Sequence, residues 1–262
     1  MALRRHTAED STAQGLNRCR GVFLDRDGTI IEEKGYLNDP EAIELIPGVA
    51  QAIRLFNYLG LKVLVVSNQS GVARGYFTDA TVEEVNGKLE ALLAHEGARL
   101  DGIYYCPHHP ADNCVCRKPE PGMLLQGADE LNIDLPHSYL VGDKGADIGA
   151  AHRVGGKGIL VLTGYGTEEL GGCQGDPPDF VARDLLEAAY WVLIQEGAER
   201  RHEMAIKKEL LEILACPKCK GDIILAKKGD GLICKTCKVI YPIKDDIPVM
   251  LIDEALPYKE KD

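Results

Sequence analysis

Several carboxylates and one lysine stand where they could carry out phosphoryl chemistry. Asp25 and Asp27 lie two residues apart directly after an apolar run, and Asp143 ends a later apolar run. Neighbouring carboxylates repel one another unless a cation joins them, and such hard oxygen ligands suit Mg²⁺. One carboxylate can then attack a phosphoryl group, while a second protonates the leaving oxygen and later activates water. Lys118 would supply fixed positive charge to the transferring group.

A second chemical cluster immediately precedes this lysine. Residues 106–116 read Cys-x-His-x₅-Cys-x-Cys, and the set is Cys106, His108, Cys114 and Cys116. Three thiolates and one imidazole suit tetrahedral zinc, whereas a disulfide is poorly suited to a reducing compartment. His109 is the adjacent alternative ligand. With four protein ligands no open position remains for catalysis, so we predict a structural ion that stiffens a loop without an apolar core.

A third cluster lies near the end of the chain. Two Cys-x₂-Cys pairs are separated by fourteen residues, and the set is Cys216, Cys219, Cys234 and Cys237. This spacing is typical of a zinc ribbon, and nearby lysines would offset the charge of four thiolates. We therefore predict two structural zinc ions per chain. Cys19 and Cys173 stand apart and receive no role.

The elements that must position these side chains alternate in type. Near-continuous apolar runs are typical of strands buried on both faces, and they lie at 21–25, 61–68, 101–106, 138–143 and 158–164. Helical patterns lie at 48–60, 78–97, 121–133 and 184–214. This alternation predicts an α/β fold with a parallel sheet and helices on both faces. The segments that separate Asp27, Ser67 and Lys118 are short, so we predict no large cap insertion. The carboxyl ends of its strands would gather the polar residues at one rim, with loop 106–116 as a wall.

Length and charge limit the organisation and the partners. The 262 residues are 45% hydrophobic, enough for one full domain and a small second one. We predict a flexible tail at 1–19, a catalytic domain at 20–200 and a small β domain at 201–262. Residues 205–262 carry 11 Lys/Arg and 10 Asp/Glu, whereas the preceding residues carry 19 and 31. The acidic first part makes nucleic acid an unlikely partner, and without a signal or membrane-spanning run we predict a cytoplasmic protein.

Four motifs carry a resemblance to a known superfamily. In order, Asp-Arg-Asp-Gly-Thr (25–29), Val-Val-Ser-Asn-Gln-Ser-Gly (65–71), Arg-Lys-Pro (117–119) and Val-Gly-Asp-Lys-Gly-Ala-Asp (141–147) resemble those of haloacid-dehalogenase-type (HAD) phosphatases. The similarity covers roughly residues 20–195 and extends to the heptose 1,7-bisphosphate 7-phosphatase and histidinol-phosphate phosphatase families. It implies an HAD-like (Rossmannoid) fold and an aspartyl-phosphate intermediate. The heptose-bisphosphate family also has the cysteine-histidine cluster, as a structural site with His108 as its histidine.

The resemblance also implies residue roles. Asp25 would be the nucleophile and Asp27 the general acid/base, while Ser67 and Asn68 would bind the phosphoryl oxygens. Mg²⁺ would be held by Asp25, the main-chain carbonyl of Asp27 and Asp143, with Lys144 adjacent. Lys118 would stabilise the transferring phosphoryl group. The remaining implied substrate contacts are Glu33, Lys34, Gly35, Tyr36, Gln69, Ser70 and Arg117.

These features predict a Mg²⁺-dependent phosphatase that removes the C7 phosphate of D-glycero-D-manno-heptose 1,7-bisphosphate for surface polysaccharide synthesis. Histidinol phosphate is the alternative substrate. The C-terminal segment resembles the small Trm112-like/UPF0434 family, whose members commonly bind other proteins. A partner-binding role dominated by this ribbon is therefore the alternative from a different functional class.

Overall fold

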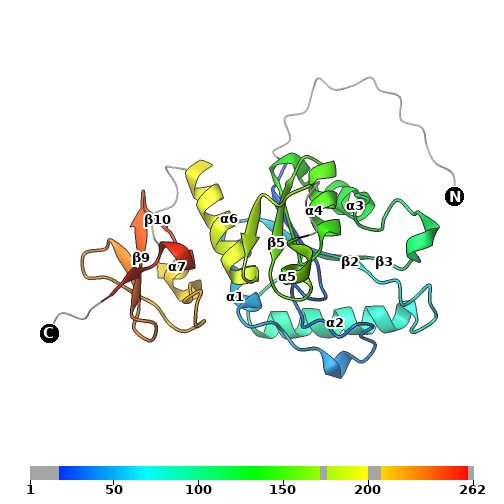
Figure 1. The fold of residues 1–262 in the computed structure, drawn as a ribbon, viewed down its shortest axis with the longest axis horizontal. Helices are drawn as coiled ribbons and strands as arrows, with labels where there is room; N and C mark the ends of the chain where they lie inside the picture. Colours follow the sequence, from blue (N-terminus) through cyan, green and yellow to red (C-terminus); the bar gives the residue numbers. More distant parts are fainter. Residues whose placement is uncertain (1–17, 172–175, 200–207, 259–262) are drawn as a thin grey trace, which may run out of the picture.

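A computed structural model describes residues 18–171, 176–199 and 208–258 (Figure 1). Most of the predicted tail at 1–19, the predicted boundary at 200/201 and Cys173 lie outside the described residues. No described helix is both long and apolar enough to cross a membrane.

Six parallel strands form the sheet of the large domain. Their bounds are β1 (Gly21–Leu24), β2 (Lys62–Asn68), β3 (Gly102–Cys106), β4 (Tyr139–Gly142), β5 (Lys157–Val161) and β6 (Phe180–Ala182). The order is β3-β2-β1-β4-β5-β6, so the chain reverses its direction of travel across the sheet between β1 and β4. The predicted parallel sheet is thus confirmed, and β6, with three residues, is a strand too short for the pattern to reveal.

Helices cover both faces of this sheet. In β2 the side chains alternate, with Val63 and Val65 packing into one hydrophobic cluster and Leu64 and Val66 into the other. One face is covered by α1 (Val49–Tyr58), α2 (Asp79–His95) and α6 (Leu185–Glu199), and the other by α3 (Gly122–Leu131) and α4 (Gly145–Arg153). Shorter helices are η1 (Pro40–Ala42), η2 (Pro110–Asp112), η3 (Leu135–His137) and α5 (Gly166–Glu169).

The helices agree only in part with those expected from the sequence. Thr78 caps α2, because its hydroxyl accepts a hydrogen bond from the Thr81 N–H at 3.3 Å. The α4 helix was not predicted, since its glycine- and alanine-rich sequence has only a weak apolar stripe. The helical stretch predicted at 184–214 contains α6 and then α7 (Lys208–Ile213), and residues 200–207 between them lie outside the described part.

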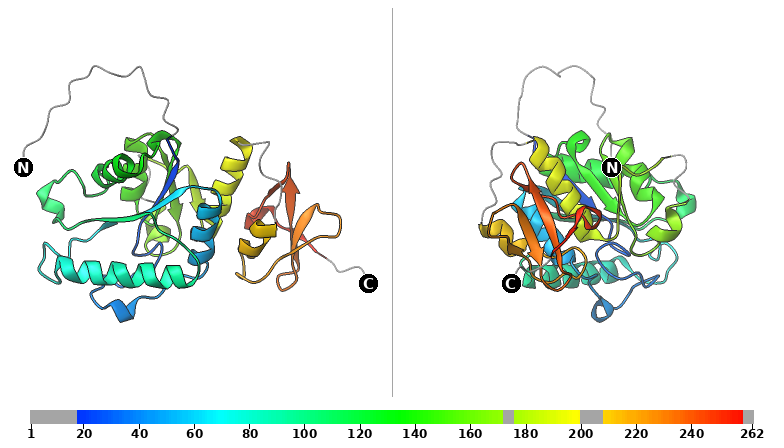
Figure 2. Two further views of the ribbon diagram at one scale, coloured as in Figure 1. Left: turned by 180° about the vertical axis from the view of Figure 1, so that it is seen from behind. Right: turned by 60° about the vertical axis from the view of Figure 1, so that its left-hand side comes forward.

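The small C-terminal domain is a β domain as predicted, and its strands pair antiparallel. It contains β7 (Ile224–Leu225), β8 (Gly231–Cys234), β9 (Val239–Lys244), β10 (Ile247–Pro248) and β11 (Leu256–Pro257), with η4 (Ile252–Glu254) before β11. It lies beside α1 and α6, on the side away from α3 and α4 (Figure 2). The Tyr190 hydroxyl in α6 donates to the Ala215 carbonyl at 2.5 Å and accepts from its N–H at 2.9 Å. The two domains therefore share one continuous hydrophobic core.

Candidate active site

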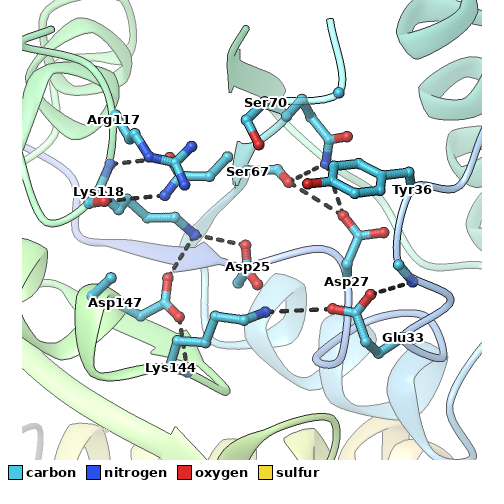
Figure 3. Close-up of a pocket in the computed structure, with 15 residues that line it drawn as sticks. Asp25, Asp27, Glu33, Tyr36, Ser67, Ser70, Arg117, Lys118, Lys144 and Asp147 are labelled. Atoms are coloured by element: carbon cyan, nitrogen blue, oxygen red, sulfur yellow. Dashed lines mark hydrogen bonds and ion pairs between the residues drawn. The ribbon is translucent and has the colours of Figure 1, made fainter. Parts of the chain in front are cut away.

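The site is built around the aspartate that follows β1. The Asp25 N–H donates to the Val141 carbonyl at 2.9 Å, which places this side chain at the carboxyl edge of the sheet. Lys118 Nζ lies 2.6 Å from Asp25 Oδ1 and 2.5 Å from Asp147 Oδ1 (Figure 3). Burial by itself lowers the pKa of Lys118, but the two carboxylates reverse this and raise it. The lysine is therefore a fixed cation in direct contact with the candidate nucleophile.

Three buried carboxylates could hold a divalent cation here. Asp25, Asp143 and Asp147 each offer an oxygen within 4.8 Å of the others. Burial and then the charge of Asp25 raise the pKa of Asp143 to about 7. Such crowding of like charges is relieved by a dication with oxygen ligands, so the donor set fits Mg²⁺. Asp147 was recognised in the fourth motif but not predicted as a ligand.

Two glycines allow the backbone to approach Asp143 closely. Gly28 and Gly164 have φ angles of 86° and 54°, and a Cβ on either would lie 2.3 Å from Asp143 Oδ2. Only glycine fits both demands, a left-handed backbone and no side chain. The Tyr165 N–H also donates to Asp143 Oδ2 at 2.9 Å, so this carboxylate is held by backbone on several sides.

Asp27 points away from the carboxylate cluster. Its oxygens accept hydrogen bonds from Arg26 Nε at 3.1 Å and Nη2 at 3.2 Å, and from Gln69 Nε2 at 2.8 Å. Gln69 also donates to the Ser67 hydroxyl at 2.7 Å. The side chain still lines the cavity beside Asp25, the placement expected of a group that exchanges protons with a leaving oxygen.

Asn68, in the second motif, holds the backbone of Lys118. Asn68 Nδ2 donates to the Lys118 carbonyl at 3.1 Å, and Asn68 Oδ1 accepts from the Lys118 N–H at 3.0 Å. This paired contact fixes the backbone of Lys118 on the end of β2. Asn68 and Ser67 also line the cavity, where the sequence predicted phosphoryl contacts for both.

The cavity above Asp25 has a volume of about 210 Å³ and contains most of the predicted substrate residues. Glu33 accepts hydrogen bonds from the Gly35 N–H at 2.7 Å and from Lys144 Nζ at 3.4 Å. Lys144 Nζ also lies 3.2 Å from Asp143 Oδ1, beside the candidate metal acid as expected. Lys34 does not line the cavity, since its ammonium group pairs with Glu44 at 2.6 Å on the surface.

The opposite wall presents a cation. Arg117 lines the cavity, and its buried Nη1 has no hydrogen-bond partner among the described residues. A buried guanidinium nitrogen without a partner suits an anionic oxygen of a ligand. Ser70 also lines the cavity as predicted, and Gly71 and Ala146 complete the lining without having been predicted.

The four predicted zinc ligands in the loop before Arg117 lie close together. Cys116 Sγ lies 3.3 Å from Cys106 Sγ and 3.4 Å from Cys114 Sγ, and His108 Nδ1 lies 3.2 Å from Cys116 Sγ. His109 instead caps η2, where its Nδ1 accepts from the Ala111 N–H at 3.2 Å. Three soft sulfurs and one imidazole nitrogen converging in this way are consistent with a zinc site.

The ribbon cysteines converge as well. Cys216 Sγ lies 3.8 Å from Cys237 Sγ, and Cys219 Sγ lies 3.6 Å from Cys234 Sγ. Burial raises the pKa of Cys216, but hydrogen bonds from the Tyr241 hydroxyl and nearby backbone lower it to about 7. A readily formed thiolate within a four-sulfur cluster is consistent with a second zinc site.

A parallel sheet with paired aspartates after its first strand and a lysine beside them defines an HAD-like hydrolase domain. Residues 115–188 match the HAD-hydrolase-like family model. The D-glycero-beta-D-manno-heptose-1,7-bisphosphate 7-phosphatase of Salmonella typhi is 48% identical over 152 residues, which are 55% of this chain and 80% of that protein. The chain belongs to the family of D-glycero-D-manno-heptose-1,7-bisphosphate 7-phosphatases.

Further similarities extend over both domains. The Thermosynechococcus vestitus D-glycero-D-manno-heptose-1,7-bisphosphate 7-phosphatase is 42% identical over 65% of this chain and 94% of its own. The D,D-heptose 1,7-bisphosphate phosphatase of B. bronchiseptica, solved with magnesium and phosphate, is 36% identical with a TM-score of 0.62, covering 67% of this chain and 99% of that one. Residues 207–246 match the Trm112p-like protein family model, so a Trm112-like domain follows the phosphatase domain.

Proposed function

We propose that this protein hydrolyses the C7 phosphate of D-glycero-D-manno-heptose 1,7-bisphosphate in a Mg²⁺-dependent reaction. The observation that carries the proposal is the Asp25 carboxylate, which faces a cavity and contacts Lys118 within a cluster of buried carboxylates. Relatives named for this activity and one solved with magnesium and phosphate support it. The reaction would serve surface polysaccharide synthesis from the cytoplasm.

Two half-reactions follow from the geometry. An oxygen of Asp25 attacks the phosphorus and the bond from phosphorus to the C7 oxygen breaks, while Asp27 gives that oxygen a proton. Asp27 then takes a proton from a water that attacks the aspartyl-phosphate, which frees inorganic phosphate and regenerates the Asp25 carboxylate. Lys118 neutralises charge on the transferring group, and Arg117 is placed to contact an anionic oxygen of the substrate.

The carboxylate cluster and the two cysteine-containing clusters would hold different metals. Asp25 and Asp143 would hold Mg²⁺ with the main-chain carbonyl of Asp27, and Asp147 is a further candidate. Bound Mg²⁺ would neutralise phosphoryl oxygens during transfer. We propose that both four-ligand clusters bind structural zinc, because each already supplies a complete tetrahedral donor set from protein side chains.

The test is a steady-state comparison of both anomers of the heptose bisphosphate with histidinol phosphate, with and without Mg²⁺. We expect release of one phosphate per heptose bisphosphate, a requirement for Mg²⁺ and a clear preference over histidinol phosphate. Asp25→Asn serves as the inactive reference, because an amide cannot form the aspartyl-phosphate. Turnover that survives in this variant, or equal use of histidinol phosphate, would contradict the proposal.

One observation favours a second role in protein binding. Cross-strand register on the ribbon aligns Ile224, Ile233, Ile240 and Leu256 in a single row across β7, β8, β9 and β11. The two outer members are 46% and 55% exposed, and the row lies outside the shared core. The turns between these strands carry lysines at 227, 228, 235 and 238. An apolar row edged by lysines suits a partner with an apolar patch and an acidic rim.

Cross-linking from the ribbon lysines in cells, followed by mass spectrometry, tests this second role. One recurrent partner should be lost in Leu256→Lys, because a charge in the row opposes apolar contact. The matched control is Leu170→Lys, which alters a leucine that is 46% exposed on the phosphatase domain. A partner pattern that is identical in wild type and Leu256→Lys would contradict docking on this row.

A further inference from the structure

We propose that Arg26 and Asn86 position the carboxylate of Asp27 for proton transfer to the leaving oxygen. The inference rests on the proposed function, in which Asp27 is the general acid/base. It assigns a positioning role to the residue between the two catalytic aspartates, and to a helix residue sixty positions further along the chain.

Arg26 is surrounded by protein. Its side chain is 1% exposed, although it carries a charge and stands at the rim of the site. The guanidinium group forms a fork on Asp27, with Nε 3.1 Å from Oδ2 and Nη2 3.2 Å from Oδ1. Its remaining terminal nitrogen, Nη1, donates to Asn86 Oδ1 at 2.9 Å. A planar fork held at its far end by a third contact allows the carboxylate little rotation.

The sequence of α2 is unfavourable to the helix at this position. The buried residues of α2 are Val82, Val85, Asn86, Leu89 and Leu93, so one amide lies in an otherwise apolar stripe. Asn86 and the following Gly87 are both poor helix formers in a helix interior. A buried amide is stabilising only where it is hydrogen-bonded, and Asn86 Oδ1 accepts its hydrogen bond from Arg26.

The other side of Asp27 is restrained separately. Gln69 Nε2 donates to Asp27 Oδ2 at 2.8 Å, and the Gln69 N–H donates to the Cys106 carbonyl at 2.8 Å. The carboxylate is therefore held between Arg26, which Asn86 of α2 contacts, and Gln69, whose backbone bonds the end of β3. Replacing Asn86 leaves Asp27 and its contact with Gln69 in place. The effect should therefore be on the orientation of the Asp27 carboxylate.

The proposed role predicts dependence on the leaving group. A sugar alkoxide leaves poorly without a proton, whereas p-nitrophenolate is a stable anion that needs none. A misoriented Asp27 should therefore slow aspartyl-phosphate formation selectively for sugar phosphates, whereas its action on water in the second half-reaction is common to both substrates. Substrate binding should change little, since Asn86 lies away from the cavity lining.

The experiment follows single-turnover release of the leaving group, which precedes water activation, and compares the full-length wild type with Asn86→Ala and Asn86→Leu. The leucine variant keeps the packed volume if the alanine variant does not fold. On heptose bisphosphate we expect the single-turnover rate to fall about tenfold with the half-saturating concentration within about twofold, and the rate on p-nitrophenyl phosphate to fall less than about threefold. Asn86→Asp keeps an acceptor for Arg26 and should restore most of the lost rate.

The control is Asn57→Ala, which removes a half-buried amide from α1 that bonds the Arg99 backbone at 3.0 and 2.9 Å, away from the site. It should leave both substrates unaffected. An unchanged single-turnover rate in the Asn86 variants, an equal fall in that rate on both substrates, or a loss seen only in the half-saturating concentration would overturn the positioning role. Failure of the proposed function is seen separately, as wild-type protein without activity on heptose bisphosphate.

Discussion

At the scale of single residues, the balance of charge around Lys118 is the most sensitive feature. The side chain is 2% exposed and contacts both Asp25 and Asp147. Replacing it with methionine would leave buried carboxylates without their cation, and removing one member of a buried pair typically costs about 3–5 kcal/mol. We expect Lys118→Met to lower the free energy of unfolding by this order and to abolish turnover, as measured by thermal unfolding and phosphate release.

Added Mg²⁺ should restore part of that stability, since a dication can neutralise the same carboxylates. Lys34→Met is the matched control, because the Lys34 pair with Glu44 is exposed and such pairs contribute about 0–1 kcal/mol. Equal stability losses in the two lysine variants would contradict this account of the site.

Which residues line the cavity was largely predictable from the motifs, but where their side chains point was not. Lys34 stands beside Glu33 in the sequence, yet the ammonium group reaches Glu44 on the surface while Glu33 enters the cavity. Asn68 was predicted as a phosphoryl contact, and its amide is also paired with the Lys118 backbone. Neither orientation could follow from sequence, because each depends on a residue brought close only by folding.

At the scale of elements, the cysteine-histidine loop connects a predicted metal to the catalytic cation. Cys116 is followed directly by Arg117 and Lys118, so the loop sets where both begin. We expect Cys114→Ser to retain one zinc ion per chain in place of two, and to raise KM severalfold through loss of loop order. Elemental analysis and steady-state kinetics measure both effects.

Wild-type KM and kcat in a Cys114→Ser protein with one zinc ion would refute this link. A parallel Cys19→Ser variant controls for loss of a thiol, because Cys19 lies outside both clusters and donates to the Leu131 carbonyl.

Another element-scale contact ties α4 to the segment before β6. His152 bonds Asp176 through Nδ1 and Asp179 through Nε2, the latter at 2.9 Å. Burial by itself lowers the pKa of His152, but the two carboxylates raise it above its usual 6.5. Because the folded protein favours protonated His152, the charged histidine stabilises the fold. This contribution is complete below about pH 6.5 and is lost as the pH rises through the folded-state pKa.

His152→Gln should therefore cost more stability at pH 6 than at pH 9, with a difference of about 1 kcal/mol or less. Chemical unfolding of both proteins at the two pH values provides the measurement. A destabilisation that grows toward pH 9 would show that the charged histidine is not the stabilising form.

At the scale of the whole molecule, the ribbon domain packs against a side of α6 that does not face the sheet. The sequence of this helix is apolar on most sides, because one side faces the sheet and another faces the ribbon. Tyr190→Phe removes the hydroxyl that satisfies both backbone groups of Ala215, which leaves buried polar groups unpaired at a cost of about 1–3 kcal/mol. We expect a lower thermal unfolding midpoint and faster proteolysis between the domains.

Tyr105→Phe is the control, since its hydroxyl contacts Asp79 at 3.0 Å on the surface and should matter little. Identical proteolysis of the Tyr190 variant and wild type would mean that this contact does not hold the domains together.

Local pattern determined the strand-helix order, the parallel sheet and the two cysteine clusters, because apolar periodicity and ligand spacing are properties of short segments. The same patterns predicted Asp25, Asp27, Asp143 and Lys118 as neighbours, since parallel strands end at one edge. Tertiary structure alone decided that Asp147 joins the buried carboxylates and that Asn86 reaches Arg26. It also decided that the ribbon packs on α1 and α6. Such contacts join distant segments, and they depend on how whole faces pack together.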